Sequence, residues 1–147
     1  MSVNERSHPS RGPVIDPAAL VTRALTEVCF GKSDGEPLEA TIDRYFAPEY
    51  HQRTDGLEAN RAEFIRHIRA LRSTITQGKV EVLEAIMQGR RIADRHRVTI
   101  TRRDGAVSQI EVYLFGELTD DGRFRRVDEV SRVIYGAEDD ADLARVR

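Results

Sequence analysis

The chain has 147 residues, of which 39% are hydrophobic, a length and composition that suit one domain with a hydrophobic core. Its 23 basic and 25 acidic side chains nearly cancel to a net charge of −2, which argues against recruitment of nucleic acid or anionic lipid. No apolar stretch approaches the roughly 20 residues of a membrane-spanning helix. The sequence therefore predicts a protein without nucleic-acid or membrane partners.

The one cysteine, Cys29, has no internal disulfide partner, and residues 1–13 lack the apolar core of a secretory signal, so we expect a cytoplasmic protein. There are no paired cysteines, no His-x-x-x-His spacing and no phosphate-binding glycine loop, so we expect neither a metal nor a cofactor. Residues 1–15 are interpreted as a flexible tail, 16–136 as the single domain and 137–147 as a polar C-terminal tail.

Three helices are predicted in the first half of the chain. The first begins at Asp16-Pro17, a capping carboxylate followed by proline, and ends at Gly31. A second, short helix ends at Pro48, and the third opens with a capping box over residues 60–63. Their apolar positions recur at helical spacing: Leu20, Ala24, Leu25 and Val28; Leu38, Ile42, Tyr45 and Phe46; Phe64, Ile68, Leu71 and Ile75.

Past Gly78 the apolar period changes from about 3.6 to 2, which predicts four long strands. Gln88-Gly89, Asp104-Gly105 and Asp121-Gly122 are the reversal signals between them, and residues 50–55 are expected to add a short extended piece. Long strands twist strongly, so such a sheet should curl around a hollow. The predicted fold class is α+β, with three N-terminal helices packed on a strongly curved antiparallel sheet that forms a cone-shaped barrel.

Strand alternation places three polar groups on apolar, inward faces. Asp94 and His96 share a face with aliphatic side chains, and Glu129 lies among valines on the last strand. A carboxylate kept from water has a raised pKa, which suits proton abstraction next to a carbonyl near neutral pH. The alternative is that Glu129 pairs with an arginine and only closes a polar gap; the candidates are Arg53, Arg97 and Arg125.

Further candidates surround this carboxylate. His96 can relay a proton if Asp94, two residues away, fixes its tautomer, or it is a satisfied core histidine. His67 edges the apolar stripe of the third helix and can face the hollow. Tyr50 and Gln52 alternate onto one side of an extended segment and offer a phenol and an amide to a carbonyl or hydroxyl group.

The third long strand is apolar on both faces, with Tyr113 and Phe115 on the side away from its aliphatic residues. Large exposed apolar patches are uncommon on monomers, and a second copy of the chain is the simplest cover. We therefore expect a homodimer through the sheet. Tyr113 belongs either to this interface or to the ligand pocket.

Residues 45–56 read Tyr-Phe-Ala-Pro-Glu-Tyr-His-Gln-Arg-Thr-Asp-Gly. With the helix through Phe64 and His67 and the ending over 121–130, this segment resembles the SnoaL-like branch of the nuclear-transport-factor-2-like superfamily, over roughly residues 17–135. The resemblance implies a cystatin-like α+β barrel that is frequently dimeric. The superfamily includes polyketide cyclases, a steroid isomerase, dehydratases and an epoxide hydrolase, alongside proteins with no catalysis.

The resemblance also implies residue roles. In SnoaL-like cyclases an aspartate near the end of the sheet acts as acid and base, and the matching position here is Glu129, longer by one methylene. The family's extended segment reads Tyr, any residue, Gln, His; Tyr50 and Gln52 match, and Arg53 stands where the histidine is expected. Arg53 therefore joins Tyr50, Gln52, His67, Asp94 and Tyr113 as a candidate substrate-binding residue.

Two functions follow from the sequence. The first is a cofactor-independent isomerase, cyclase or lyase that moves protons on a small, apolar, carbonyl-bearing molecule, with Glu129 and His96 as catalytic residues. The second is a non-catalytic ligand-binding or dimerisation module of the same fold. The sequence leaves both open, and it does not name the substrate.

Overall fold

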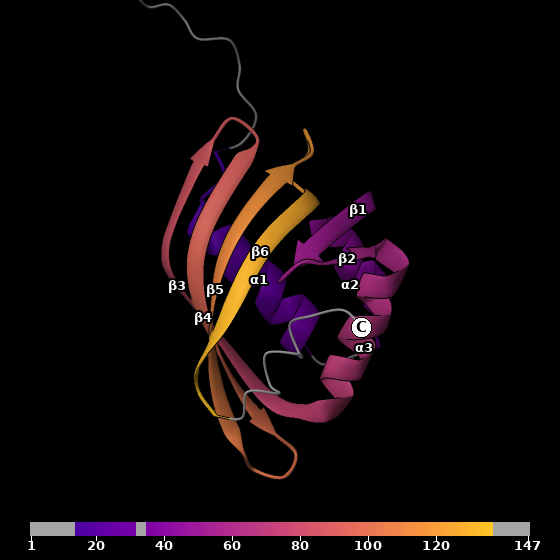
Figure 1. Ribbon diagram of the computed structural model, residues 1–147. Helices are drawn as coiled ribbons and strands as arrows, with labels where there is room; N and C mark the ends of the chain where they lie inside the picture. Colours follow the sequence, from indigo (N-terminus) through magenta and orange to yellow (C-terminus); the bar gives the residue numbers. More distant parts are fainter. Residues whose placement is uncertain (1–13, 32–34, 137–147) are drawn as a thin grey trace, which may run out of the picture.

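A mixed sheet of six strands and three helices make up the computed structural model, which describes residues 14–31 and 35–136 (Figure 1). The sequence-based interpretations of residues 1–13 and 137–147 as tails lie outside the described residues. Within the described part of the chain, no helix combines the length and the apolar character that crossing a membrane requires.

The predicted helix starts are confirmed. In α1 (Pro17–Phe30) the side chain of Asp16 accepts a hydrogen bond from the backbone N–H of Ala19, and the helix gives way to Gly31. In α3 (Arg61–Thr74) Asn60 and Glu63 form a reciprocal capping box, each side chain accepting from the other's backbone N–H at 2.9 Å. Local sequence therefore fixes where both long helices begin.

The second helix is shorter than predicted. α2 (Leu38–Tyr45) ends before Pro48, and Phe46 already begins strand β1 (Phe46–Thr54). Pro48 is tolerated inside this strand because pairing with the neighbouring strand is interrupted between Phe46 and His51, so its missing N–H removes no ladder bond. The predicted short extended piece is thus part of a nine-residue strand.

A tight hairpin joins β1 to the short strand β2 (Leu57–Asn60). Asp55 and Gly56 both have positive φ, 50° and 85°, as a two-residue type I′ turn requires. The carboxylate of Asp55 accepts hydrogen bonds from the backbone N–H and the hydroxyl of Ser131, at 2.8 and 2.5 Å. This turn therefore clamps the end of β1 to the last strand.

The long strands pair as successive antiparallel hairpins, and the full sheet order is β2-β1-β6-β5-β4-β3. The prediction of a purely antiparallel sheet is wrong at one place, because β1 pairs parallel with the last strand. The sheet is also open rather than closed into a barrel, since β2 and β3 are its two edges. The long strands are β3 (Ile75–Gln88), β4 (Arg91–Arg102), β5 (Val107–Leu118) and β6 (Phe124–Tyr135).

The helices cover one face of this sheet. Figure 1 shows α1 crossing behind the long strands, with α2 and α3 beside β1 and β2. The apolar stripes of the helices and the inward side chains of the strands form one buried core. Near the start of β1 it includes an aromatic cluster of Phe46, Tyr50, Phe64 and Phe124, with ring centroids 4.7 to 5.5 Å apart along its contacts.

The capping box gives a first prediction. Replacing Asn60 with alanine should lower the free energy of unfolding by about 1 kcal/mol, because the N–H groups at the start of α3 lose their acceptor. Urea denaturation of Asn60→Ala and of the matched Asn60→Ser variant measures this, and the serine variant should keep most of the stability. Equal midpoints for wild type and Asn60→Ala would contradict the role of the box.

Candidate active site

A cavity of about 110 Å³ lies between the inner face of the sheet and the helices. Most of its wall is aliphatic or aromatic, from α1, α3, β1 and every long strand except β3. Five of the side chains singled out from the sequence lie in this wall: Tyr50, Gln52, His67, His96 and Glu129. Segments far apart in the sequence thus bring a few polar groups into an otherwise apolar space.

Glu129 enters the cavity from β6. Across the sheet it lies between Leu114 of β5 and Thr54 of β1, and its side chain is half-buried. The hydroxyl of Thr54 donates a hydrogen bond to Oε2 of Glu129 at 2.9 Å. Thr54 is fully buried, so this contact is shielded from water.

Burial raises the pKa of Glu129 from 4.5 to about 7. The nearby carboxylates of Asp94 and Asp55 act in the same direction, while His96 and the hydrogen bond from Thr54 oppose it. Both forms of the carboxyl group are therefore accessible near neutral pH, as an acid/base group requires.

The alternative of an arginine partner for Glu129 does not fit the structure. Among the described residues no arginine forms an ion pair with it. Arg97 instead donates to Glu111 at 3.4 Å, and Arg125 lies 4.0 Å from Glu49. The carboxyl group of Glu129 is thus tuned by burial and by a hydroxyl group rather than neutralised by a guanidinium.

The inner face of β1 carries a chain of hydrogen bonds toward Glu129. Tyr50 Oη donates to Gln52 Oε1 at 2.8 Å, and Gln52 Nε2 donates to Thr54 Oγ1 at 3.3 Å. All three side chains are buried. Sequence analysis missed Thr54, although the alternation that selected Tyr50 and Gln52 extends to it.

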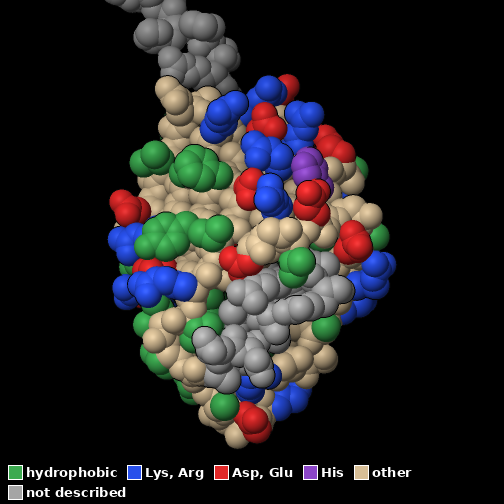
Figure 2. Space-filling view, in the orientation of Figure 1, with side chains coloured by type: hydrophobic (Ala, Val, Ile, Leu, Met, Phe, Trp, Pro, Cys, Tyr) green, Lys and Arg blue, Asp and Glu red, His purple; other side chains and the backbone are tan. Residues whose placement is uncertain are grey.

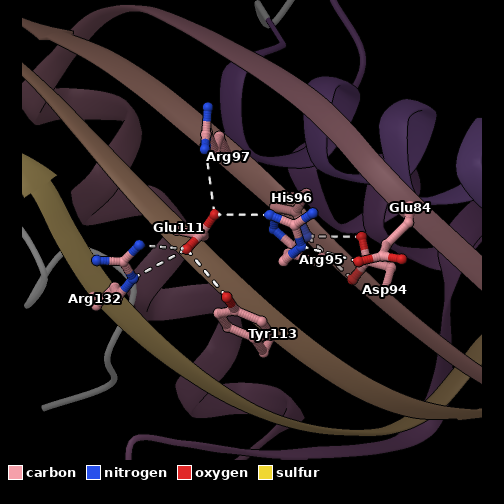
Figure 3. A network of polar contacts seen from close by, with 8 residues as sticks. All are labelled: Glu84, Asp94, Arg95, His96, Arg97, Glu111, Tyr113 and Arg132. Atoms are coloured by element: carbon pink, nitrogen blue, oxygen red, sulfur yellow. Dashed lines mark hydrogen bonds and ion pairs between the residues drawn. The ribbon is translucent and has the colours of Figure 1, made fainter.

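His96 and Asp94 contact each other on β4. Nδ1 of His96 lies 2.8 and 3.1 Å from the two carboxylate oxygens of Asp94, and both residues are buried (Figure 3). With Asp94 accepting from Nδ1–H, Nε2 of His96 is the nitrogen available to a ligand. Asp94 does not itself line the cavity, so the structure gives it an orienting place behind His96 rather than a substrate contact.

Besides Asp94, two candidate substrate-binding residues lie outside the cavity. Arg53 is exposed, because alternation along β1 turns it away from its buried neighbours Gln52 and Thr54. Tyr113 is 45% exposed on the outer face of the sheet, where its hydroxyl donates to Glu111. The prediction that Arg53 and Tyr113 line the pocket is therefore wrong, because both side chains point away from the inner face of the sheet. His67, on the third helix α3, does line the cavity.

No family model matches the chain. A protein of Schizosaccharomyces pombe, "Uncharacterized protein C11D3.04c", is 32% identical over 103 residues, which cover 70% of this chain and 78% of the yeast protein. The chain belongs to the same family as this yeast protein.

Solved structures are similar over most of the chain. An NTF2-like protein of unknown function from Exiguobacterium sp. 255-15 is 16% identical, with a TM-score of 0.63, over 76% of this chain and 97% of that one. The chain has the NTF2-like fold. At this identity the likeness concerns the fold alone.

Two further neighbours share the NTF2-like fold and carry names of enzymes. IdmH of Streptomyces antibioticus, named as a proposed polyketide cyclase, is 12% identical with a TM-score of 0.63, over 80% of this chain and 92% of that one. An LEH-like epoxide hydrolase of M. tuberculosis is 12% identical with a TM-score of 0.61, over 78% and 81%.

A further buried carboxylate, missed from the sequence, lies on the outer face of the NTF2-like sheet. Glu111 is 1% exposed and accepts hydrogen bonds from Arg95, Arg132 and Tyr113, at 3.0 to 3.3 Å (Figure 3). Burial acts to raise the pKa of Glu111, but Arg132, Tyr113 and Arg95 outweigh it and hold that pKa below its usual range. Glu111 therefore stays charged and organises the outer face.

Among the described residues, no three histidine, cysteine or acidic side chains lie close enough together to hold a metal ion.

The raised pKa of Glu129 predicts a pH-dependent stability. Folding favours the protonated acid. The stabilisation that this gives to the folded state is complete below pH 4.5 and is lost as the pH rises through about 7. In Glu129→Gln this loss is absent, and Thr54 keeps an oxygen acceptor. The free energy of unfolding of the variant, relative to that of wild type, should be about 1 to 3 kcal/mol higher at pH 8 than at pH 5. Denaturant unfolding at the two pH values measures this difference. A constant difference would contradict the raised pKa.

Proposed function

We propose that this protein is a cofactor-independent enzyme that moves a proton on a small, apolar, carbonyl-bearing molecule. The observation that carries the proposal is the carboxyl group of Glu129, which opens into an apolar cavity and has a pKa of about 7. Near neutral pH about half of such a group is ionised, and a desolvated carboxylate abstracts a proton from the carbon next to a carbonyl. Glu129 is therefore assigned the role of base.

The same carboxyl group can complete the reaction. Once Glu129 has taken the proton it is a neutral acid, and returning the proton to another atom of the enolate gives an isomerised product. In a cyclisation the enolate carbon instead forms a bond to a second carbonyl carbon of the same molecule, and Glu129 gives its proton to the oxygen of that carbonyl. His96 is assigned the role of proton relay, because Asp94 accepts from its Nδ1–H and leaves Nε2 to the ligand. Tyr50 and Gln52 supply the polar edge against which a carbonyl group aligns.

The size of the cavity limits the substrate. A cavity of about 110 Å³ is below the roughly 300 to 1,000 Å³ of sites for drug-sized ligands and close to the roughly 150 Å³ that holds benzene. We therefore propose a monocyclic or short-chain substrate. The cyclase and epoxide hydrolase names of the structural neighbours support an enzymatic role for this fold.

The alternative is a ligand-binding or dimerisation module without catalysis. The hydrogen bonds of Tyr50 and Gln52 to each other and to Thr54 favour it, because polar groups that satisfy one another are those of a stable pocket wall. Turnover separates the two functions, since a module binds a small ketone without exchanging its protons.

Proton exchange tests the enzymatic proposal. The protein in D₂O should catalyse deuterium incorporation next to the carbonyl of cyclohex-2-enone, followed by ¹H NMR. Glu129→Gln should lose at least about 100-fold in rate, the usual contribution of a positioned base. The matched control is Arg53→Gln, on the exposed side of β1, which should exchange at the wild-type rate. Binding of the ketone without exchange would support the module instead.

We also propose that two copies of the chain pair through the outer face of the sheet. Ile86, Tyr113, Phe115 and Val130 are 45% to 71% exposed there, and Figure 2 shows apolar side chains on this face among acidic and basic ones. An apolar centre surrounded by polar side chains is typical of a protein–protein interface.

Charge supports a second copy as the occupant. Across β3 to β6 one row of this face reads Glu81, Arg97, Glu111 and Arg132, so acidic and basic side chains alternate. A two-fold axis that lies in the interface, parallel to the strands, sets such a row antiparallel to its own copy, so the exposed Glu81 of each copy can meet the exposed Arg132 of the other. The face is therefore complementary to itself.

Sedimentation velocity at micromolar concentration tests this pairing. Wild type should sediment as a dimer, and Phe115→Glu should sediment as a monomer because it places a charge in the apolar centre. The matched control is Leu57→Glu, which charges an exposed apolar residue on the edge strand β2 and should stay dimeric. A monomeric wild type would rule out the assembly.

A further inference from the structure

The parallel pairing of β1 with β6 brings two side chains into register on the inner face. Thr54 lies directly across from Glu129, and Gln52 lies across from Val127. The inward stripe of β1 therefore ends at the carboxyl group to which the proposed function assigns the chemistry. Its hydrogen bonds all run in one direction, from Tyr50 to Gln52 to Thr54 to Glu129.

We propose that Thr54 is a positioning residue, whose hydroxyl holds Oε2 of Glu129 and so directs Oε1 toward the ligand. This inference rests on the proposed role of Glu129 as the base. Gln52 and Tyr50 take part by fixing the direction in which the Thr54 hydroxyl donates.

The direction follows from the number of donors and acceptors. A threonine hydroxyl has one hydrogen to donate, and because Gln52 Nε2 already donates to Thr54 Oγ1, that hydrogen goes to the carboxylate. The amide of Gln52 is held in this orientation by Tyr50, whose hydroxyl donates to the amide oxygen. Each bond in such a series polarises the next, so the donation to Glu129 is strengthened.

Several charged or titratable groups face Glu129 from the elements packed around it. His96 and Asp94 approach from β4, and Asp55 from the β1–β2 turn. Cys29 of α1 and His67 of α3 line the same cavity. Burial raises the pKa of the Cys29 thiol to about 12, so it stays neutral and leaves the charge balance to the other groups. The donation from Thr54 stabilises the charged form of Glu129 against burial and the two aspartates.

The test is the titration of Glu129 in three proteins, read by ¹³C NMR of carboxyl-labelled glutamate and assigned with Glu129→Gln. Thr54→Val keeps the shape of the buried side chain and removes the hydroxyl, so the pKa of Glu129 should rise by about one unit above wild type. Thr54→Ser keeps the donor and should titrate like wild type. Tyr50→Phe, at the far end of the series, should shift the pKa upward by less than Thr54→Val.

Exchange of cyclohex-2-enone protons gives the second readout. Thr54→Val should slow exchange about tenfold at neutral pH and move its pH dependence to higher pH, and Thr54→Ser should restore both. A purely structural threonine would lower thermal stability without moving the titration of Glu129. Equal titration of Glu129 in wild type and Thr54→Val would therefore overturn the inference.

The outcomes for the two proposals are separable. If Glu129→Gln exchanges protons at the wild-type rate, the proposed function fails, and the positioning role in catalysis fails with it. If Glu129→Gln is inactive but Thr54→Val titrates and exchanges like wild type, the proposed function stands and the role of Thr54 is overturned. A raised pKa in Thr54→Val with restored behaviour in Thr54→Ser supports the positioning role.

Discussion

The parallel seam between β1 and β6 is the constraint on which the site depends. It sets Thr54 beside Glu129, and the Asp55 turn holds the seam in place through two hydrogen bonds to Ser131. Without this pairing β6 would be the edge of the sheet, and the carboxyl group of Glu129 would lose both the Thr54 donor and the cover of β1. The pairing of β1 with β6 therefore shields the carboxyl group of Glu129 from water and gives it one hydrogen-bond donor, the hydroxyl of Thr54.

The electrostatics of the cavity come from a balance of opposed effects. Burial and two aspartates disfavour the charge on Glu129, while His96 and the Thr54 hydroxyl favour it, and the result is a pKa of about 7. On the outer face, Glu111 is also buried, but its arginine partners hold its pKa low. Two glutamates on opposite faces of one sheet thus have different chemistry: Glu129 can exchange protons near neutral pH, and Glu111 holds several arginines in place.

Sequence patterns predicted the features of the structure that depend on residues close together in the chain. The capping box at Asn60, the long strands and the inward parity of His96 all follow from local spacing. The parallel pairing of β1 does not, because it joins residues about 75 positions apart and leaves no periodic signal. Arg53 was assigned to the pocket from a motif, although the parity that turns Gln52 inward turns Arg53 outward. The burial of Glu111 arises from arginines on the two flanking strands, which no single segment reveals.

The proposed chemistry requires that a small carbonyl compound binds beside Glu129 inside the cavity. A crystal structure of the protein with bound cyclohex-2-enone tests it most directly. The account predicts the ring within the cavity, a carbon next to its carbonyl about 3 to 3.5 Å from the free carboxylate oxygen of Glu129, and the other oxygen still held by Thr54. A ketone bound elsewhere, or a Glu129 side chain turned away into solvent, would contradict the account.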